Sequence, residues 1–93
     1  MPKVVVPAAL RQFTDGAGHV DVDERDGASL AEVLDALGAR LPALTRRIRD
    51  EQGELRRFVN VYVDGEDARR LAGLDTAVPA GAEILILPSV AGG

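Results

Sequence analysis

The last six residues hold the one arrangement in this chain that could enter covalent chemistry. An apolar run is followed by Pro88-Ser89-Val90-Ala91-Gly92-Gly93, which ends in two glycines and the terminal carboxylate. Six extended residues span roughly 20 Å, enough to enter a pocket on another protein. Because glycine has no Cβ, the last two residues can pass a narrow channel and bring the carboxylate to an enzyme. The alternative is an ordinary frayed terminus, since chain ends with small residues are commonly disordered.

The rest of the chain lacks the residues of a self-contained active site. The absence of cysteine excludes disulfides, zinc–thiolate sites and thiol catalysis. The single histidine, His19, cannot form a multi-histidine metal site, and we expect it at a solvated loop or strand edge. Ser29 has no histidine nearby in the sequence, and no Gly-rich phosphate loop occurs. We therefore expect a protein that is not an enzyme and that binds no metal or cofactor of its own.

Composition is typical of one soluble domain. The 93 residues are 46% hydrophobic and 28% charged, with a net charge of −4. A negative charge argues against general nucleic-acid binding, which needs a basic surface. No apolar run has the length of a transmembrane helix, and the N-terminus has no signal-peptide pattern. These features predict a cytoplasmic protein without nucleic-acid or membrane partners.

Two strands and two helices are expected in the first half of the chain. Residues 3–7 contain three consecutive β-branched valines and end at a proline, and residues 20–23 alternate valine with aspartate. Each run predicts a strand of one hairpin. Ser29 and Glu32 have the spacing of a capping box, which starts a helix at Ser29. Pro42 ends that helix and can begin a second, short one. The first helix has one apolar stripe: Leu30, Val33, Leu34, Leu37 and Leu41.

The second half predicts two stronger strands. In residues 58–63 three valines point toward the core, while Phe58 and Tyr62 point toward the opposite face. Asp64-Gly65 is a strong signal for a tight turn. Residues 82–87 are almost continuously apolar, which predicts a central strand buried on both faces. Apolar anchors are expected between these strands, at Leu71, Leu74 and Val78.

This order of elements predicts an α+β domain of the β-grasp, or ubiquitin-like, class. A mixed sheet of four to five strands would be covered by one main helix. The last strand would lie beside the first and run parallel to it, because the intervening chain supplies a long crossover. We expect the domain to comprise residues 1–87 and a flexible C-terminal tail to comprise residues 88–93.

The range from Arg40 to Arg57 has an unusual charge. It contains six arginines and three acidic residues, a local charge of +3, so the remainder of the chain carries −7. A charge run on a short amphipathic helix is usually a solvated face. The alternative is a docking surface for an acidic partner.

The element order and the final residues resemble the ThiS/MoaD family of ubiquitin-like sulfur carriers. The most specific part is residues 86–93, where an apolar pair and a proline precede Val-Ala-Gly-Gly. Residues 57–63, followed by an acidic turn, resemble the CysO-type carriers of actinobacterial cysteine biosynthesis. MoaD proteins are often shorter in the helical middle, and the longer arginine-rich stretch here favours the CysO-type branch.

The resemblance implies a mechanism in which partner enzymes act on the tail. An E1-like adenylyltransferase and sulfurtransferase would use ATP to adenylate the carboxylate of Gly93. A sulfur donor would then displace AMP and leave a thiocarboxylate. In the CysO-type branch a pyridoxal-phosphate cysteine synthase would accept the sulfur, and a metalloprotease would release the product. ATP, metal and pyridoxal phosphate would all belong to these partners.

The resemblance also assigns roles to residues. Gly93 would be the reacting group, and Gly92 would keep the tail slim. Leu87 and Pro88 would mark where the tail leaves the domain, with Leu87 part of an apolar docking patch. The partner's channel would be lined by Ser89, Val90 and Ala91, and the patch would be extended by Phe58, Tyr62 and Leu71, for which ordinary packing is an equal alternative.

Three other functions stay open at this point. The chain could be the small subunit of molybdopterin synthase. It could be a protein modifier that forms isopeptide bonds from Gly93 to lysines. It could also be a β-grasp interaction module whose tail has no chemical role.

Overall fold

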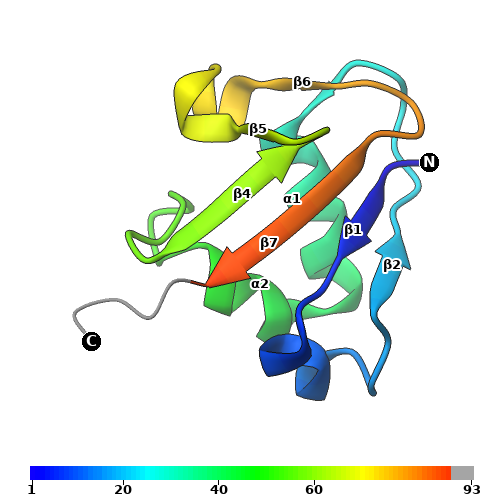
Figure 1. Ribbon diagram of the computed structural model, residues 1–93, viewed down its shortest axis with the longest axis vertical. Helices are drawn as coiled ribbons and strands as arrows, with labels where there is room; N and C mark the ends of the chain where they lie inside the picture. The colour runs from blue at the N-terminus through cyan, green and yellow to red at the C-terminus, as the bar shows by residue number, and fades with distance from the viewer. Residues whose placement is uncertain (89–93) are drawn as a thin grey trace.

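A five-stranded mixed sheet with helices on one face forms the body of the protein (Figure 1). The computed structural model describes residues 1–88. From one edge to the other the strands are β2 (His19–Asp21), β1 (Lys3–Val5), β7 (Glu83–Pro88), β4 (Val59–Val63) and β5 (Glu66–Asp67). β1 and β7 are parallel, and the other neighbours are antiparallel. The predicted β-grasp arrangement, with the last strand parallel to the first, is confirmed.

The main helix, α1 (Leu30–Arg40), lies behind the sheet in the view of Figure 1. The predicted capping box is present at its start. The Glu32 backbone N–H donates to Ser29 Oγ at 3.1 Å, and the Ser29 backbone N–H donates to Glu32 Oε1 at 3.1 Å. Two of the N–H groups that a helix start leaves without intrahelical partners are thereby satisfied.

The second helix, α2 (Pro42–Ile48), begins at Pro42 as predicted. Leu44 and Ile48 are fully buried on its inner side. The two helices approach closely at Gly38, where a Cβ would lie 3.0 Å from Thr45 Oγ1. Three short 3₁₀ helices complete the helical elements of the described chain: η1 (Ala8–Phe13), η2 (Ala68–Arg70) and η3 (Gly73–Asp75).

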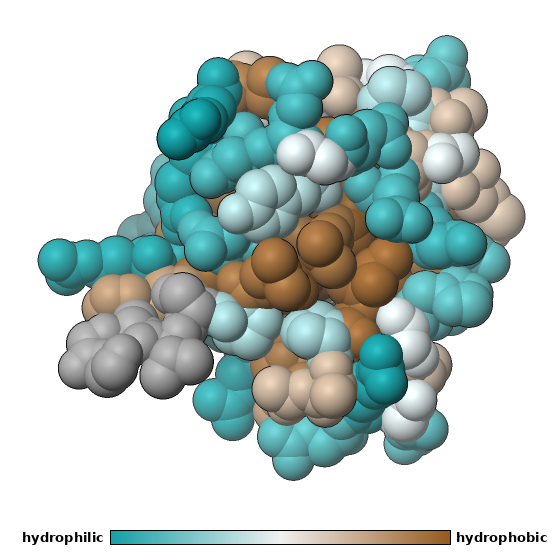
Figure 2. Space-filling model, in the orientation of Figure 1, coloured by the Kyte–Doolittle hydropathy of each residue, from teal (hydrophilic) through white to brown (hydrophobic). Residues whose placement is uncertain are grey.

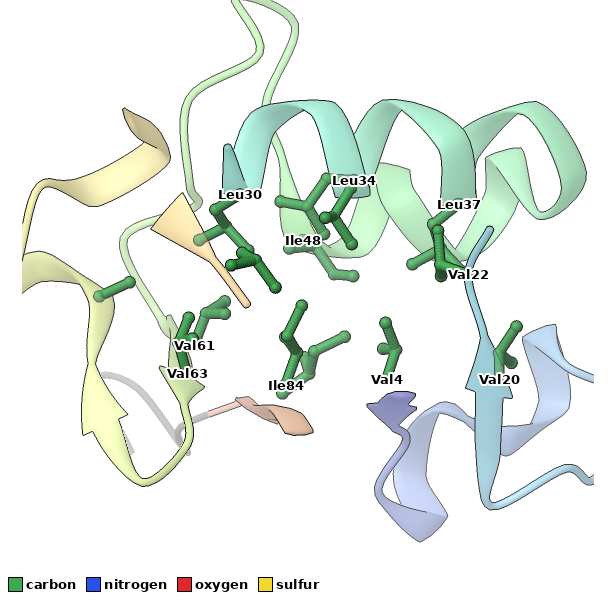
Figure 3. Packing of buried hydrophobic residues seen from close by; sticks show 14 of the residues in the cluster. Val4, Val20, Val22, Leu30, Leu34, Leu37, Ile48, Val61, Val63 and Ile84 are labelled. Atoms are coloured by element: carbon green, nitrogen blue, oxygen red, sulfur yellow. The ribbon is translucent and has the colours of Figure 1, made fainter. Parts of the chain in front are cut away.

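The core lies between α1 and the sheet (Figure 3). Ile84 contributes from a central strand with Leu34 above it on the helix, and Leu37 of the helix lies beside Val22. Fully burying one such side chain contributes about 1.5–3 kcal/mol. The predicted apolar stripe of α1 is confirmed for four buried residues, Leu30, Val33, Leu34 and Leu37, while Leu41 is only partly buried at the helix end.

The hairpin from β4 to β5 turns at Asp64 and Gly65, as predicted. Both residues have positive φ, 49° and 86°, which suits a two-residue turn whose twist matches the strands. Asp64 also fixes the start of β7. Its backbone N–H donates to the Glu83 carbonyl at 2.8 Å, and its Oδ1 accepts from the Glu83 N–H at 2.9 Å.

Two expectations from the sequence need correction, and one sheet was not predicted. β7 is central, but it is buried on one face only, because the helices cover a single side of the sheet. Leu71, expected as an apolar anchor, has 44% of its surface exposed. A second, two-stranded sheet was not predicted: β3 (Ala28–Ser29) pairs with β6 (Ala77–Val78).

Within residues 1–88 no helix is long and apolar enough to cross a membrane.

Candidate functional site

The root of the tail is the end of β7. The register with β1 ends where Val5 pairs with Leu85, whereas the register with β4 continues until Val59 pairs with Pro88. The last residues of β7 therefore extend beyond β1 and are paired on one side only. Pro88 has no N–H group to donate, so strand pairing through its nitrogen stops there.

β7 includes Pro88, one residue beyond the predicted end of the domain at residue 87. The remaining tail residues with predicted roles, Ser89, Val90, Ala91, Gly92 and Gly93, lie outside the described residues. Their roles stay predictions.

The face of the sheet opposite the helices carries an apolar surface. Val5, Leu85 and Tyr62 lie abreast on three neighbouring strands, since Leu85 pairs with both of the others. All three are half-buried. Leu87 lies two residues further along β7 on the same face and has 39% of its surface exposed. Figure 2 shows a hydrophobic area over the middle of the sheet, surrounded by hydrophilic residues.

Phe58 extends this surface toward the root of the tail. It lies in the turn that immediately precedes β4 and has 50% of its surface exposed, whereas the next residue, Val59, is buried. The guanidinium carbon of Arg57 lies 5.5 Å from its ring centroid, within the range of a cation–π contact. We use the name open-face patch for Val5, Phe58, Tyr62, Leu85 and Leu87.

The structure thus brings together three of the predicted patch residues, Phe58, Tyr62 and Leu87. Leu71 is exposed, but it lies in the turn after η2 and not on a strand of this face. Val5 and Leu85 were missed by the sequence analysis. Their signal was present in the alternation of β7, where Ile84 and Ile86 face the core and the two leucines face away.

The docking role predicted for the open-face patch stays a prediction, and its chemistry is compatible with that role. Its side chains are aliphatic or aromatic, and contiguous exposed apolar area commonly marks a protein interaction site. Among residues 1–88 no group of three histidine or acidic side chains is placed to hold a metal ion.

Comparisons with known proteins place these features in a family. The model of the ThiS family matches residues 4–93. The sulfur carrier protein CysO of Mycobacterium tuberculosis is 40% identical over 92 residues, which cover 97% of this chain and 96% of that protein. Small archaeal modifier protein 1 of Haloferax volcanii is 38% identical over 78 residues, covering 84% of this chain and 85% of that protein.

A solved structure gives the same result. A chain in the crystal structure of the Amycolatopsis orientalis BexX/CysO complex superposes with a TM-score of 0.88 at 38% identity, and the match covers 100% of both chains. The family match extends to residue 93 and therefore includes the Val-Ala-Gly-Gly segment.

Proposed function

The chain belongs to the ThiS family, as its sequence predicted, and on that premise we propose that it is a sulfur carrier protein of the CysO type. In this proposal the carboxylate of Gly93 is adenylated by an E1-like enzyme and converted to a thiocarboxylate. The observation that carries the proposal is the 40% identity with a sulfur carrier over nearly the whole of both chains. The chain then acts as a carrier and co-substrate, and the catalytic groups belong to its partners.

The chemistry explains why such a partner is needed. A terminal carboxylate has a reference pKa of about 3.5, so it is ionised at neutral pH and is a poor acyl donor. In the first step a carboxylate oxygen attacks the α-phosphorus of ATP, and pyrophosphate leaves. In the second step a sulfide-equivalent donor attacks the acyl carbon, AMP leaves, and the thiocarboxylate remains. Sulfur stays covalently attached until an acceptor takes it.

The described residues would supply recognition. The open-face patch presents an apolar surface next to the end of β7, so a partner that covers the patch also receives the tail. β7 stays paired with β4 up to Pro88, so in this proposal the tail begins beside β4. The A. orientalis neighbour forms a complex with a second protein, BexX, which supports docking of this chain on a partner protein.

The acceptor belongs to the same proposal. Similarity to CysO favours cysteine biosynthesis, with a pyridoxal-phosphate cysteine synthase as the enzyme that receives the sulfur. A metalloprotease would then cut the product from Gly93. A gene neighbourhood with both enzymes would support this branch, and stable pairing with a larger molybdopterin synthase subunit would contradict it.

A second candidate function is protein modification, which the 38% identity with small archaeal modifier protein 1 favours. A lysine amine would attack the same adenylated carboxyl group, and AMP would leave as an isopeptide bond formed. Mass spectrometry of cellular proteins separates the two functions. Lysines that carry a remnant of Gly92-Gly93 would show protein modification. If no such lysines are found, sulfur transfer is the favoured function.

The direct test of activation is ATP–pyrophosphate exchange with the E1-like enzyme of the same organism. Wild-type chain is expected to support exchange. A chain lacking Gly93 and a chain with one residue added after it are expected to fail, because the carboxylate moves away from the adenylation centre. All three should melt alike, since the changes lie outside the β-grasp domain. Exchange by the extended chain without prior trimming would contradict the proposal.

A further inference from the structure

Four arginines gather where α2 is joined to β4, and we call Arg46, Arg47, Arg56 and Arg57 the arginine cluster. All four are exposed. The Nε of Arg56 donates to the backbone carbonyl of Arg46 at 2.7 Å, which holds the loop against the helix. Arg46, Arg47 and Arg56, with Phe13 and Ala43, line a surface hollow of about 600 Å³. A second hollow of about 340 Å³ adjoins it, because Arg56 lines both.

Within the described part of the chain no ion pair joins an arginine of the cluster to a carboxylate, although Arg46 also lines a hollow with Asp35, Asp50 and Glu51. The ion pairs of the described residues join Arg25 to Glu24 and Glu32, and Arg49 to Asp35. One carboxylate, that of Asp50, lines the second hollow, but its Oδ1 accepts the backbone N–H groups of Gln52 and Glu54.

Aromatic rings support two of the guanidinium groups. The guanidinium carbon of Arg47 lies 5.0 Å from the ring centroid of Phe13, and Arg57 is placed similarly over Phe58. A guanidinium stacked on a ring loses less freedom when it forms a planar, two-bond contact with a carboxylate. The cluster therefore presents oriented donors for carboxylate groups.

The cluster is also next to the root of the tail. Arg57 and Phe58 immediately precede Val59, which pairs with Pro88. Phe58 belongs to the open-face patch, so the basic surface and the apolar surface meet at this point. A partner that receives the tail would come close to both.

We propose that the arginine cluster binds an acidic surface on the enzyme that activates the tail, and that a carboxylate of that enzyme enters the hollow between Arg46, Arg47 and Arg56. This inference rests on the proposed sulfur-carrier function. A protein partner fits better than a nucleic acid, because the rest of the chain carries −8 once these four charges are set aside from the net −4. A long polyanion would meet that negative surface, whereas a local acidic patch would not.

The first test needs no enzyme. An acidic probe, hexaglutamate peptide, is titrated into ¹⁵N-labelled chain while the arginine Nε–Hε signals are followed by NMR. Signals of the cluster should shift at low salt and return at high salt, and those of Arg25 and Arg70 should stay in place. Equal shifts for all arginines would overturn the proposal. Tighter binding of a short RNA or of inorganic phosphate than of the peptide would also overturn it.

The second test uses matched double variants in the adenylation reaction. Arg46→Gln/Arg47→Gln removes two charges from the cluster, and Arg25→Gln/Arg70→Gln removes two charges elsewhere. The first is expected to raise KM about tenfold at low salt and less at high salt, with kcat unchanged, whereas the second should match wild type. Arg46→Lys/Arg47→Lys should recover part of the loss because it keeps the charge.

The two proposals fail in different ways. If the wild-type chain is not adenylated at all, the sulfur-carrier function is wrong, and with it the assignment of the cluster to the activating enzyme. If the wild-type chain is adenylated and the Arg46→Gln/Arg47→Gln variant is adenylated with the same KM, only the inference about the cluster is overturned. Thermal melting of each variant shows that it is folded.

Discussion

Two adjacent residues of β7 are expected to differ in role, one in the stability of the domain and the other in docking. Ile86 is fully buried against the core, and Leu87 points to the open face with 39% of its surface exposed. Because successive side chains of a strand alternate between faces, the same truncation acts on different properties at the two positions.

We predict that Leu87→Ala will raise the KM for adenylation while changing the free energy of unfolding by less than about 0.5 kcal/mol, as is usual for surface changes. Ile86→Ala is the matched control. It should cost about 2–5 kcal/mol of stability, because it leaves a cavity in the core. Urea unfolding and steady-state kinetics measure the two effects. An unchanged KM for folded Leu87→Ala would remove Leu87 from the docking surface.

Glu32 makes the stability of the domain depend on pH. The carboxylate accepts from the guanidinium of Arg25 at 2.6 and 3.2 Å and from the backbone N–H of Ser29 at 3.1 Å. These hydrogen bonds lower the pKa of Glu32 from 4.5 to about 2, and the hydrogen bond from Arg25 has the largest effect. Because the folded-state pKa is the lower one, this stabilisation is present above pH 4.5 and is lost as the pH falls toward 2.

We therefore predict a smaller acid-induced fall in melting temperature for Glu32→Gln than for wild type between neutral pH and about pH 3. Glutamine can keep the hydrogen bond to Ser29 but cannot lose a charge. Glu24→Gln is the control, since it leaves both partners of Glu32 in place. Identical pH profiles for Glu32→Gln and wild type would show that the Arg25 contact does not persist in solution.

At the scale of elements, the start of α1 is a local feature that the sequence predicts well. Ser29 caps the helix and also belongs to β3, whose pairing with β6 holds the preceding chain. We predict that Ser29→Ala will lower the free energy of unfolding by about 1 kcal/mol, because the Glu32 N–H loses its acceptor. Ser29→Thr, which keeps a hydroxyl acceptor, should lose less in the same urea titration. If both variants lose the same free energy of unfolding, the loss comes from packing in β3 and not from the missing cap.

Elements whose formation depends on residues close in sequence could be predicted. Elements that form by pairing with residues far away in sequence could not. The capping box, the apolar stripe of α1 and the turn at Asp64 and Gly65 each leave a pattern within a few residues. The pairing of Ala28 with Val78 leaves none, since each strand has two residues and the partners are far apart in sequence. Such pairs become visible only once the fold brings them together.

The open-face patch shows a related limit. A run such as Ile84 to Leu87 has the same composition whether its second face is covered by a helix or left for a partner. Its apolar composition predicts burial on both faces, whereas the structure leaves Leu85 half-buried and Leu87 exposed. The tail chemistry stays a prediction, and it depends on the identity of residues rather than on what packs against them.

At the scale of the whole molecule, the surfaces proposed for recognition lie at one end. The open-face patch reaches the end of β7, and the arginine cluster adjoins it through Phe58. The rest of the chain is acidic and would repel an acidic surface on a partner. Such a partner would therefore approach the end that carries the arginine cluster. The domain would thus orient the tail by both shape and charge.

The central claim is that Gly93 carries sulfur. Intact-mass spectrometry tests it most directly, after incubation of the wild-type chain with the E1-like enzyme of the same organism, ATP and a sulfur source. We predict a mass gain equal to the exchange of one oxygen for one sulfur, located in the C-terminal peptide and absent when ATP is omitted. An unchanged mass with every E1-like enzyme of that organism would contradict the sulfur-carrier function.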